Sequence, residues 1–123
     1  MFNQHYNPIL FDSYWRDRII KTNLIFSIVA NFILWLGLIW QFKNFSESVP
    51  LHYNIYYGID LIGPWYQILV MPGLGLLFIL INLLASAIIY RKEKMIGYFL
   101  VGACSLCQLI FVLASIFITF INY

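Results

Sequence analysis

Three long apolar runs make up most of this chain, and short polar stretches separate them. The runs are expected to form helices over residues 22–42, 65–90 and 95–123. An α-helix needs about 20 residues to cross roughly 30 Å of hydrocarbon, and each run is at least that long. The pattern therefore predicts an all-α membrane protein, with three transmembrane helices in a single domain over residues 1–123.

The N-terminal arm, residues 1–21, mixes aromatic side chains with cations. That mixture is typical of a segment that lies in the membrane interface. A short helix is expected within it, starting either at Asn7-Pro8 or at Asp12-Ser13, because these residue types favour the first positions of a helix. The apolar run after the arm is longer than that of a signal peptide, so we expect it to remain in the protein.

Two connections join the predicted helices: a long loop over residues 43–64 and a tight polar turn over residues 91–94. Six of the seven cations lie on the arm or in the turn, and only Lys43 lies in the loop. Cytoplasmic segments of membrane proteins carry the excess of Lys and Arg. The N-terminus and the turn are therefore predicted to be cytoplasmic and the loop extracytoplasmic. The six cations are Arg16, Arg18, Lys21, Arg91, Lys92 and Lys94.

The composition supports this fold class. Hydrophobic residues make up 63% and charged residues 10% of the chain, with a mean hydropathy of +0.84, whereas soluble domains have roughly 45–50% apolar and about 25% charged residues. No basic patch suggests nucleic acid binding. We expect a multi-pass protein of the cell membrane, such as a bacterial plasma membrane, that contacts the lipid bilayer and a protein partner or a second copy of itself.

Neutral polar and small side chains recur on one face of each predicted helix. Polar groups in hydrocarbon need partners, so these faces are expected to contact protein. At about 1.5 Å of rise per residue, Asn31, Asn82 and Gln108 lie at similar depths, and we predict that they meet near the midplane and exchange hydrogen bonds, within the chain or across a homo-oligomer. The faces comprise Asn23, Ser27 and Asn31; Gly75, Asn82 and Ser86; and Gly97, Cys104, Gln108, Ser115 and Asn122.

The 43–64 loop alternates apolar and polar residues from Leu51 onward, which indicates a half-buried extended strand. Gly58 would then supply a turn, so that His52, Asn54 and Asp60 face one another or water. Three interpretations are open: a self-satisfied polar cluster that fixes the loop, a cluster that contacts a ligand or peptide, and a metal site. One His and one Asp are fewer than the ligands of a zinc site, so no metal is predicted.

The loop carries an ordered set of residue types, and a helix containing a proline follows it. The set is Pro50, Leu51, His52, Tyr53, Asn54, Gly58, Asp60 and Gly63. Over about residues 46–80 this order resembles the small membrane module called domain of unknown function 1648, which also occurs at the start of sporulation-delay immunity proteins. The resemblance implies a module between two spans that is associated with toxin-peptide immunity and signalling.

No catalytic group or cofactor site stands out. Cys104 and Cys107 have the spacing of a redox motif, but they lie roughly 15 Å into the predicted bilayer, where a reactive thiolate is disfavoured. The sequence favours a small non-enzymatic accessory subunit, or a peptide-sensing or immunity-type module, that acts through its extracytoplasmic loop. The alternatives are a transporter or channel component, for which the spans lack the usual ionisable residues, and a membrane thiol oxidoreductase.

Overall fold

The computed structural model describes residues 8–123, which are mostly helical. Three segments are long and apolar enough to cross a membrane, as the sequence predicted: Arg18–Phe42, Trp65–Ile89 and Lys94–Asn122. The elements in chain order are α1 (Pro8–Arg16), α2 (Arg18–Phe42), β1 (Val49–Asn54), β2 (Gly58–Gly63), the 3₁₀ helix η1 (Trp65–Leu69), α3 (Val70–Ile89) and α4 (Lys94–Asn122).

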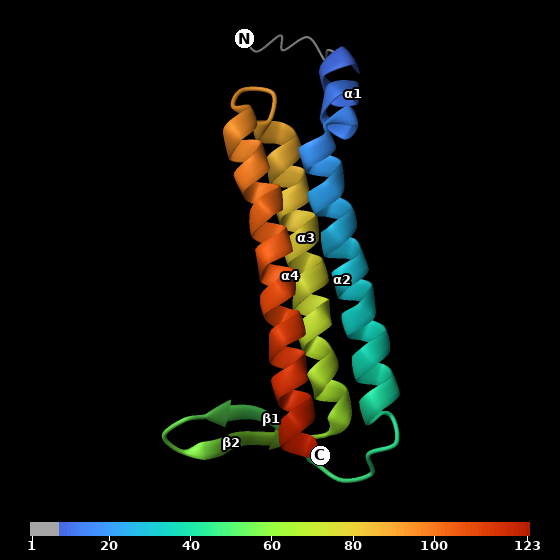
Figure 1. Cartoon of the computed structure of the whole chain (residues 1–123), viewed down its shortest axis with the longest axis vertical. Coiled ribbons are helices and arrows are strands. Elements are labelled where there is room, and N and C mark those ends of the chain that lie inside the picture. Colours follow the sequence, from blue (N-terminus) through green and yellow to red (C-terminus); the bar gives the residue numbers. More distant parts are fainter. Residues whose placement is uncertain (1–7) are drawn as a thin grey trace, which may run out of the picture.

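The three long helices form an elongated bundle (Figure 1). Helices α2 and α4 run in the same direction and pack on each other, and α3 runs antiparallel to both, while α1 lies beyond the N-terminal end of α2. The two strands form an antiparallel hairpin that projects sideways from the opposite end of the bundle. The bundle therefore has a helical end, with α1 and the turn between α3 and α4, and a hairpin end.

The hairpin is a departure from an all-α fold, although the extended strand and the Gly58 turn were expected. The first long helix also begins earlier than residue 22, because the Asp17 side chain caps α2 and α2 starts at Arg18. Helix α1 begins at Pro8, one of the two expected starts. The alternative start at Asp12-Ser13 is wrong, since both residues lie inside α1, and Asn7 lies outside the described residues.

Apolar side chains pack in two separate clusters, one at each end of the bundle. The cluster at the helical end contains Tyr14, Ile20, Tyr90 and Val101. The cluster at the hairpin end contains Leu38, Phe42, Val49 and Ile68. Polar side chains occupy much of the interior between them: Ser27, Asn31, Asn82, Ser86 and Gln108 are all buried. This arrangement suits a membrane protein, because lipid provides no hydrophobic driving force between helices and polar contacts can hold them together.

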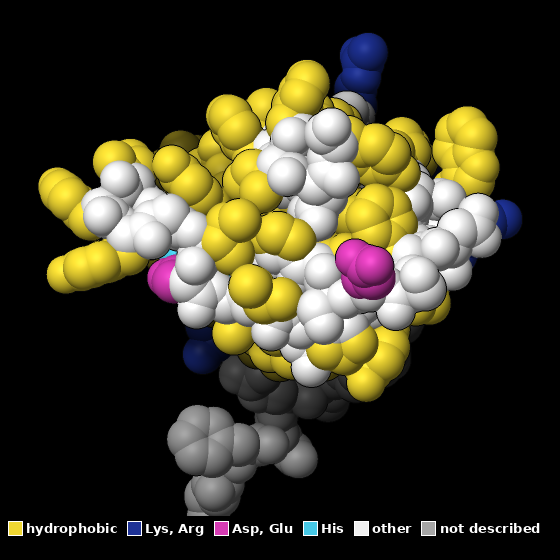
Figure 2. All heavy atoms as spheres, turned by 90° about the horizontal axis from the view of Figure 1, so that it is seen from below, with side chains coloured by type: hydrophobic (Ala, Val, Ile, Leu, Met, Phe, Trp, Pro, Cys, Tyr) yellow, Lys and Arg dark blue, Asp and Glu magenta, His cyan; other side chains and the backbone are white. Residues whose placement is uncertain are grey.

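Large apolar side chains also cover the outside of the bundle. Helix α4 is the least enclosed of the three spans: 11% of its most apolar window is buried, against 28% for each of the other two. Figure 2 shows the hairpin end, where hydrophobic side chains predominate and charged ones are sparse. A surface of this kind is compatible with lipid contact along the spans.

Candidate functional site

The hairpin contains every residue that the sequence singled out in the loop. Its strands are paired through Tyr53 with Ile59 and through Asn54 with Gly58, and the three residues between Asn54 and Gly58 form the loop. Gly58 has a φ of 74°, which lies in the left-handed region that glycine adopts without strain. The Asn54 Oδ1 atom accepts from the Tyr56 backbone N–H at 2.9 Å and so fixes the turn.

His52 and Asp60 meet on the hairpin, with Nδ1 of the histidine 2.7 Å from Oδ1 of the aspartate. The strand register explains the contact, because Asp60 lies next to Ile59, the partner of Tyr53. The side chains are 62% and 38% exposed, respectively. Asn54 does not join them, since its side chain serves the turn. The pair is therefore a surface contact that stabilises the hairpin and is accessible to a partner.

The base of the hairpin is anchored to the bundle. Val49 is 1% exposed and packs in the cluster at the hairpin end. The Asn122 Nδ2 atom, at the end of α4, donates to the Pro50 carbonyl at 3.3 Å. A Cβ on Gly63 would collide with the Gln67 side chain and come within 2.8 Å of Leu51, so only glycine fits there without rearrangement. These contacts hold the base while leaving the distal part free.

The tip of the hairpin is uncovered in this chain. Ile55, Tyr56 and Tyr57 are 87%, 88% and 84% exposed, the highest values among the large hydrophobic residues that are described. Tyr53 is also about half exposed, at 53%. Hydrophobic side chains gather at this protruding tip on the left of Figure 2. Large aromatic and aliphatic side chains exposed together are typical of surfaces that contact proteins or membranes.

The buried amides Asn31 and Gln108 form a bridge between α2 and α4, which we call the amide bridge. The Asn31 Nδ2 atom donates to Gln108 Oε1 at 3.2 Å and to the Pro72 carbonyl at 2.9 Å. Gln108 Nε2 donates to the Gly75 carbonyl at 3.0 Å. The third helix, α3, thus contributes backbone oxygens and not a side chain. Gly75 makes this approach feasible, since a Cβ there would lie 2.8 Å from Asn31 Nδ2.

Asn82 does not take part in the amide bridge, contrary to the sequence prediction. It is buried, but its Nδ2 atom donates to the Phe78 carbonyl of its own helix at 2.9 Å. The level of the amide bridge on α3 is set by Pro72 and Gly75, and Asn82 lies seven residues after Gly75, about 10 Å farther along the helix. Rise per residue gives the depth of a residue along its own helix, and it does not detect an offset of this size between two helices.

A second cluster, around Asp17, was not predicted. The Asp17 Oδ2 atom accepts from the phenols of Tyr90 and Tyr98, each at 2.6 Å, and Oδ1 accepts from the backbone N–H groups of Ile19 and Ile20. Burial alone raises the pKa of Asp17, but these hydrogen bonds outweigh it and the pKa lies below its ordinary value. The carboxylate therefore joins the starts of α2 and α4 to the end of α3.

Aromatic residues surround this carboxylate. The Tyr14 ring packs edge-to-face on Tyr90, with centroids 5.2 Å apart, and burial raises the pKa of the Tyr14 phenol although the Ser86 side chain partly offsets the rise. Burial and the bond to Asp17 raise the pKa of Tyr90, so it remains a donor at neutral pH. The available sequence signal was an Asp a few residues before the first long apolar run, which is an N-cap pattern.

The two cysteines are free thiols inside α4. Cys104 is buried against α3, with Sγ 4.0 Å from the Phe78 carbonyl, and Cys107 is half-buried. Among residues 8–123, no three or more His, Cys, Asp or Glu side chains come together as they would around a metal ion.

Comparison with known proteins gives no match to a protein family, to a curated protein or to a solved structure.

Proposed function

We propose that this chain is a small, non-enzymatic, multi-pass membrane protein that binds a protein or peptide partner through its hairpin. The observation that carries the proposal is the uncovered tip, where three consecutive large side chains are more than four-fifths exposed on a base that is firmly anchored. Exposed Tyr and Ile on a rigid support are suited to fill pockets of a partner, and aromatic residues are enriched in such interfaces.

The edge of β2 supports binding of an extended segment. Strand β2 pairs only with β1 among the described residues, so its other edge presents unpaired backbone groups. On β1, by contrast, Pro50 lacks an N–H and its carbonyl is already bound by Asn122. Unpaired edges are templates for the addition of a further strand. A partner strand would therefore add to β2 and contact the exposed residues near the tip.

The resemblance of residues 46–80 to domain of unknown function 1648 favours a partner of the peptide-toxin or signalling kind. The distribution of cations supports an extracytoplasmic hairpin, because Lys43 is the only one of seven at that end. A peptide partner arriving from outside would then meet the hairpin first. Polar side chains inside the bundle are neutral and hydrogen-bonded, which is compatible with a structural role and gives no support to an ion pathway.

Site-specific photo-crosslinking tests the binding role. A photoreactive residue at Tyr56, in native membranes, should give one discrete protein or peptide adduct. The matched control is Phe120 on α4, which is 76% exposed and should give lipid adducts only. The adduct at Tyr56 should disappear when Tyr57 is changed to Ser. Lipid adducts alone at both positions would contradict the proposal.

The side of the membrane is tested separately, so that the two parts of the proposal can fail independently. In a background with alanine at Cys104 and Cys107, a cysteine at Ser48 should react with a membrane-impermeant reagent on intact cells. A cysteine at Lys92 should react only after the membrane is opened. The reverse pattern would place the hairpin in the cytoplasm and leave the crosslinking result standing.

A further inference from the structure

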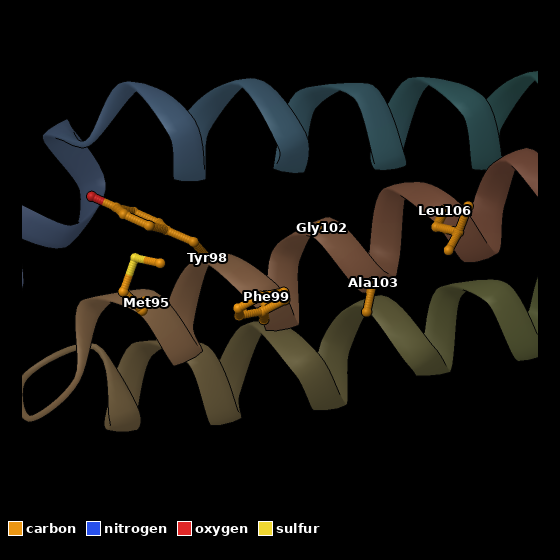
Figure 3. A pocket seen from close by; sticks show the side chains of 6 residues that line it. All are labelled: Met95, Tyr98, Phe99, Gly102, Ala103 and Leu106. Carbon is orange, nitrogen blue, oxygen red and sulfur yellow. The ribbon is translucent and has the colours of Figure 1, made fainter.

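The outer face of α4 carries an apolar groove near the helical end of the bundle. The groove has a volume of about 460 Å³. Figure 3 shows its six lining side chains, all from α4: Met95, Tyr98, Phe99, Gly102, Ala103 and Leu106. The small residues Gly102 and Ala103 form the low floor; along α4, Met95, Tyr98 and Phe99 precede this floor and Leu106 follows it. A Cβ built on Gly102 meets nothing within 4 Å, so the floor is open to the outside.

The length of this groove matches one leaflet of a bilayer. From Met95 to Leu106 the helix rises about 16 Å at 1.5 Å per residue. Half of the hydrocarbon core is about 15 Å. The groove also begins directly after Lys94, the first residue of α4, and therefore at the boundary between the charged turn and the apolar span. It has the length and the starting depth of a single acyl chain that enters from one surface.

The entrance of the groove is basic. Lys94 is exposed, with its Nζ atom 5.6 Å from the centre of the Tyr90 ring, and Lys92 is exposed in the preceding turn. The hydrogen bond between Tyr98 and Asp17 brings the start of α2, with the exposed Arg18 and Lys21, to the level of the groove.

At the helical end of the bundle, the acidic residues offset only half of the positive charge. Six cations stand against Asp12, Asp17 and Glu93, which leaves a net charge of +3 at the helical end. The hairpin end, with Lys43, Glu47 and Asp60, has a net charge of −1. An apolar groove below a basic surface complements a molecule with a negative head and an apolar chain.

We propose that this groove binds an anionic phospholipid, with one acyl chain lying along Gly102 and Ala103 and the headgroup held by Lys94 and its neighbouring cations. Tyr98 lies near the entrance, one turn of α4 after Lys94. Figure 3 shows its side chain reaching toward the start of α2, and the bond to Asp17 holds it there. The Asp17 cluster thus sets the shape of the entrance. The inference is independent of the hairpin and of any partner that the hairpin binds.

Native mass spectrometry of the full-length protein, with added phosphatidylglycerol or phosphatidylcholine, tests the proposal. The wild-type chain should retain one phosphatidylglycerol in preference to phosphatidylcholine. The double variant G102L/A103L fills the floor and should weaken that retention by about tenfold or more. K94Q should weaken it by about fivefold, which corresponds to the contribution of one cation near an anionic headgroup.

Matched controls separate this site from general lipid contact. Gly37 lines a larger hollow at the hairpin end, about 660 Å³, and a Cβ there also meets nothing within 4 Å. G37L and K43Q should therefore leave phosphatidylglycerol retention unchanged. Equal retention in G102L/A103L and G37L would overturn the proposal, as would equal retention of the two lipids by the wild type. A dimer that G102L/A103L converts to a monomer would assign the groove to a second copy and also overturn it.

Discussion

The amide bridge inside the bundle and the pair of His52 and Asp60 on the hairpin are both side-chain contacts between separate elements. Asn31 and Gln108 are 3% and 0% exposed, whereas the side chains of His52 and Asp60 are 62% and 38% exposed. Water can replace the partners of the exposed pair, but nothing can replace those of the buried amides. The shorter contact is therefore the weaker one, and burial determines which of the two holds the fold together.

The largest effect is expected at Gly75, beside the amide bridge. G75A would place a Cβ 2.8 Å from Asn31 Nδ2 and 3.1 Å from the Gln108 amide. Overpacking of this kind costs about 1–3 kcal/mol. The matched control is G73A in the same helix, where the added Cβ meets nothing within 4 Å and the gain in helix propensity is about 0.5–1 kcal/mol. Unfolding in mixed detergent micelles should separate the two variants, and equal stabilities would disprove a tight fit at Gly75.

Replacement of the amides themselves should show coupling. N31L and Q108L should each lower the free energy of unfolding by about 1–3 kcal/mol, because each leaves buried polar groups without a partner. The double variant should cost less than the sum, with a coupling of about 0.6–2 kcal/mol. N31L combined with N82L should be additive, since Asn82 bonds only within its own helix. Additivity in both cycles would show that the amide bridge contributes nothing.

An intermediate effect is expected at the half-buried Asp17. The folded pKa of Asp17 lies below its ordinary value of 3.8, so folding favours the charged form. The resulting stabilisation is fully present above about pH 4 and is lost as the pH falls toward the folded pKa. D17N should remove this acid dependence while keeping an N-cap, and the loss of the charge that accepts from Tyr90 and Tyr98 should cost about 1 kcal/mol at neutral pH. Equal acid profiles for wild type and D17N would contradict the assignment.

The smallest effect is expected on the hairpin. H52Q or D60N should change the free energy of unfolding by about 0.2–1 kcal/mol, because water can replace either partner of an exposed contact. A loss of stability as great as that of N31L would show that the hairpin pair is structurally central, and would reverse the comparison.

Much of the fold could be predicted from the hydrophobic pattern, whereas the pairing of side chains in the interior could not. The lengths of the three apolar runs were enough to predict the three long helices. The alternation of apolar and polar residues from Leu51, together with Gly58, was enough to predict an extended strand followed by a turn. The helix faces containing Ser27, Asn31 and Gln108 were expected to contact protein, and these three residues are buried. Periodicity identifies which face is polar, because the helical repeat is fixed.

The hydrogen bonds between these buried side chains depend on features that the sequence pattern of polar residues does not contain. Rise per residue gives depth along one helix but neither the tilt nor the offset between helices, so Asn82 was placed with Asn31. The acceptors on α3 are backbone carbonyls of Pro72 and Gly75, which no side-chain pattern records. The Asp17 cluster depends on two tyrosines more than 70 residues away in the sequence. The hydrogen-bond partner of a polar residue can be assigned only once the relative positions of the helices are known.

The parallel course of α2 and α4 has a consequence for how the spans can move. Side-chain hydrogen bonds join these two helices at successive levels, from Asp17 with Tyr98 through Asn31 with Gln108 to Gln41 with Thr119. The paired residues are separated by 81, 77 and 78 positions in the sequence. A slide of one helical turn, about 5.4 Å, would break all of these bonds at once and offer no equivalent set. The two helices are therefore held in a single register along the bundle axis. Any sliding movement along that axis must involve α3, or it must move α2 and α4 together as a rigid pair.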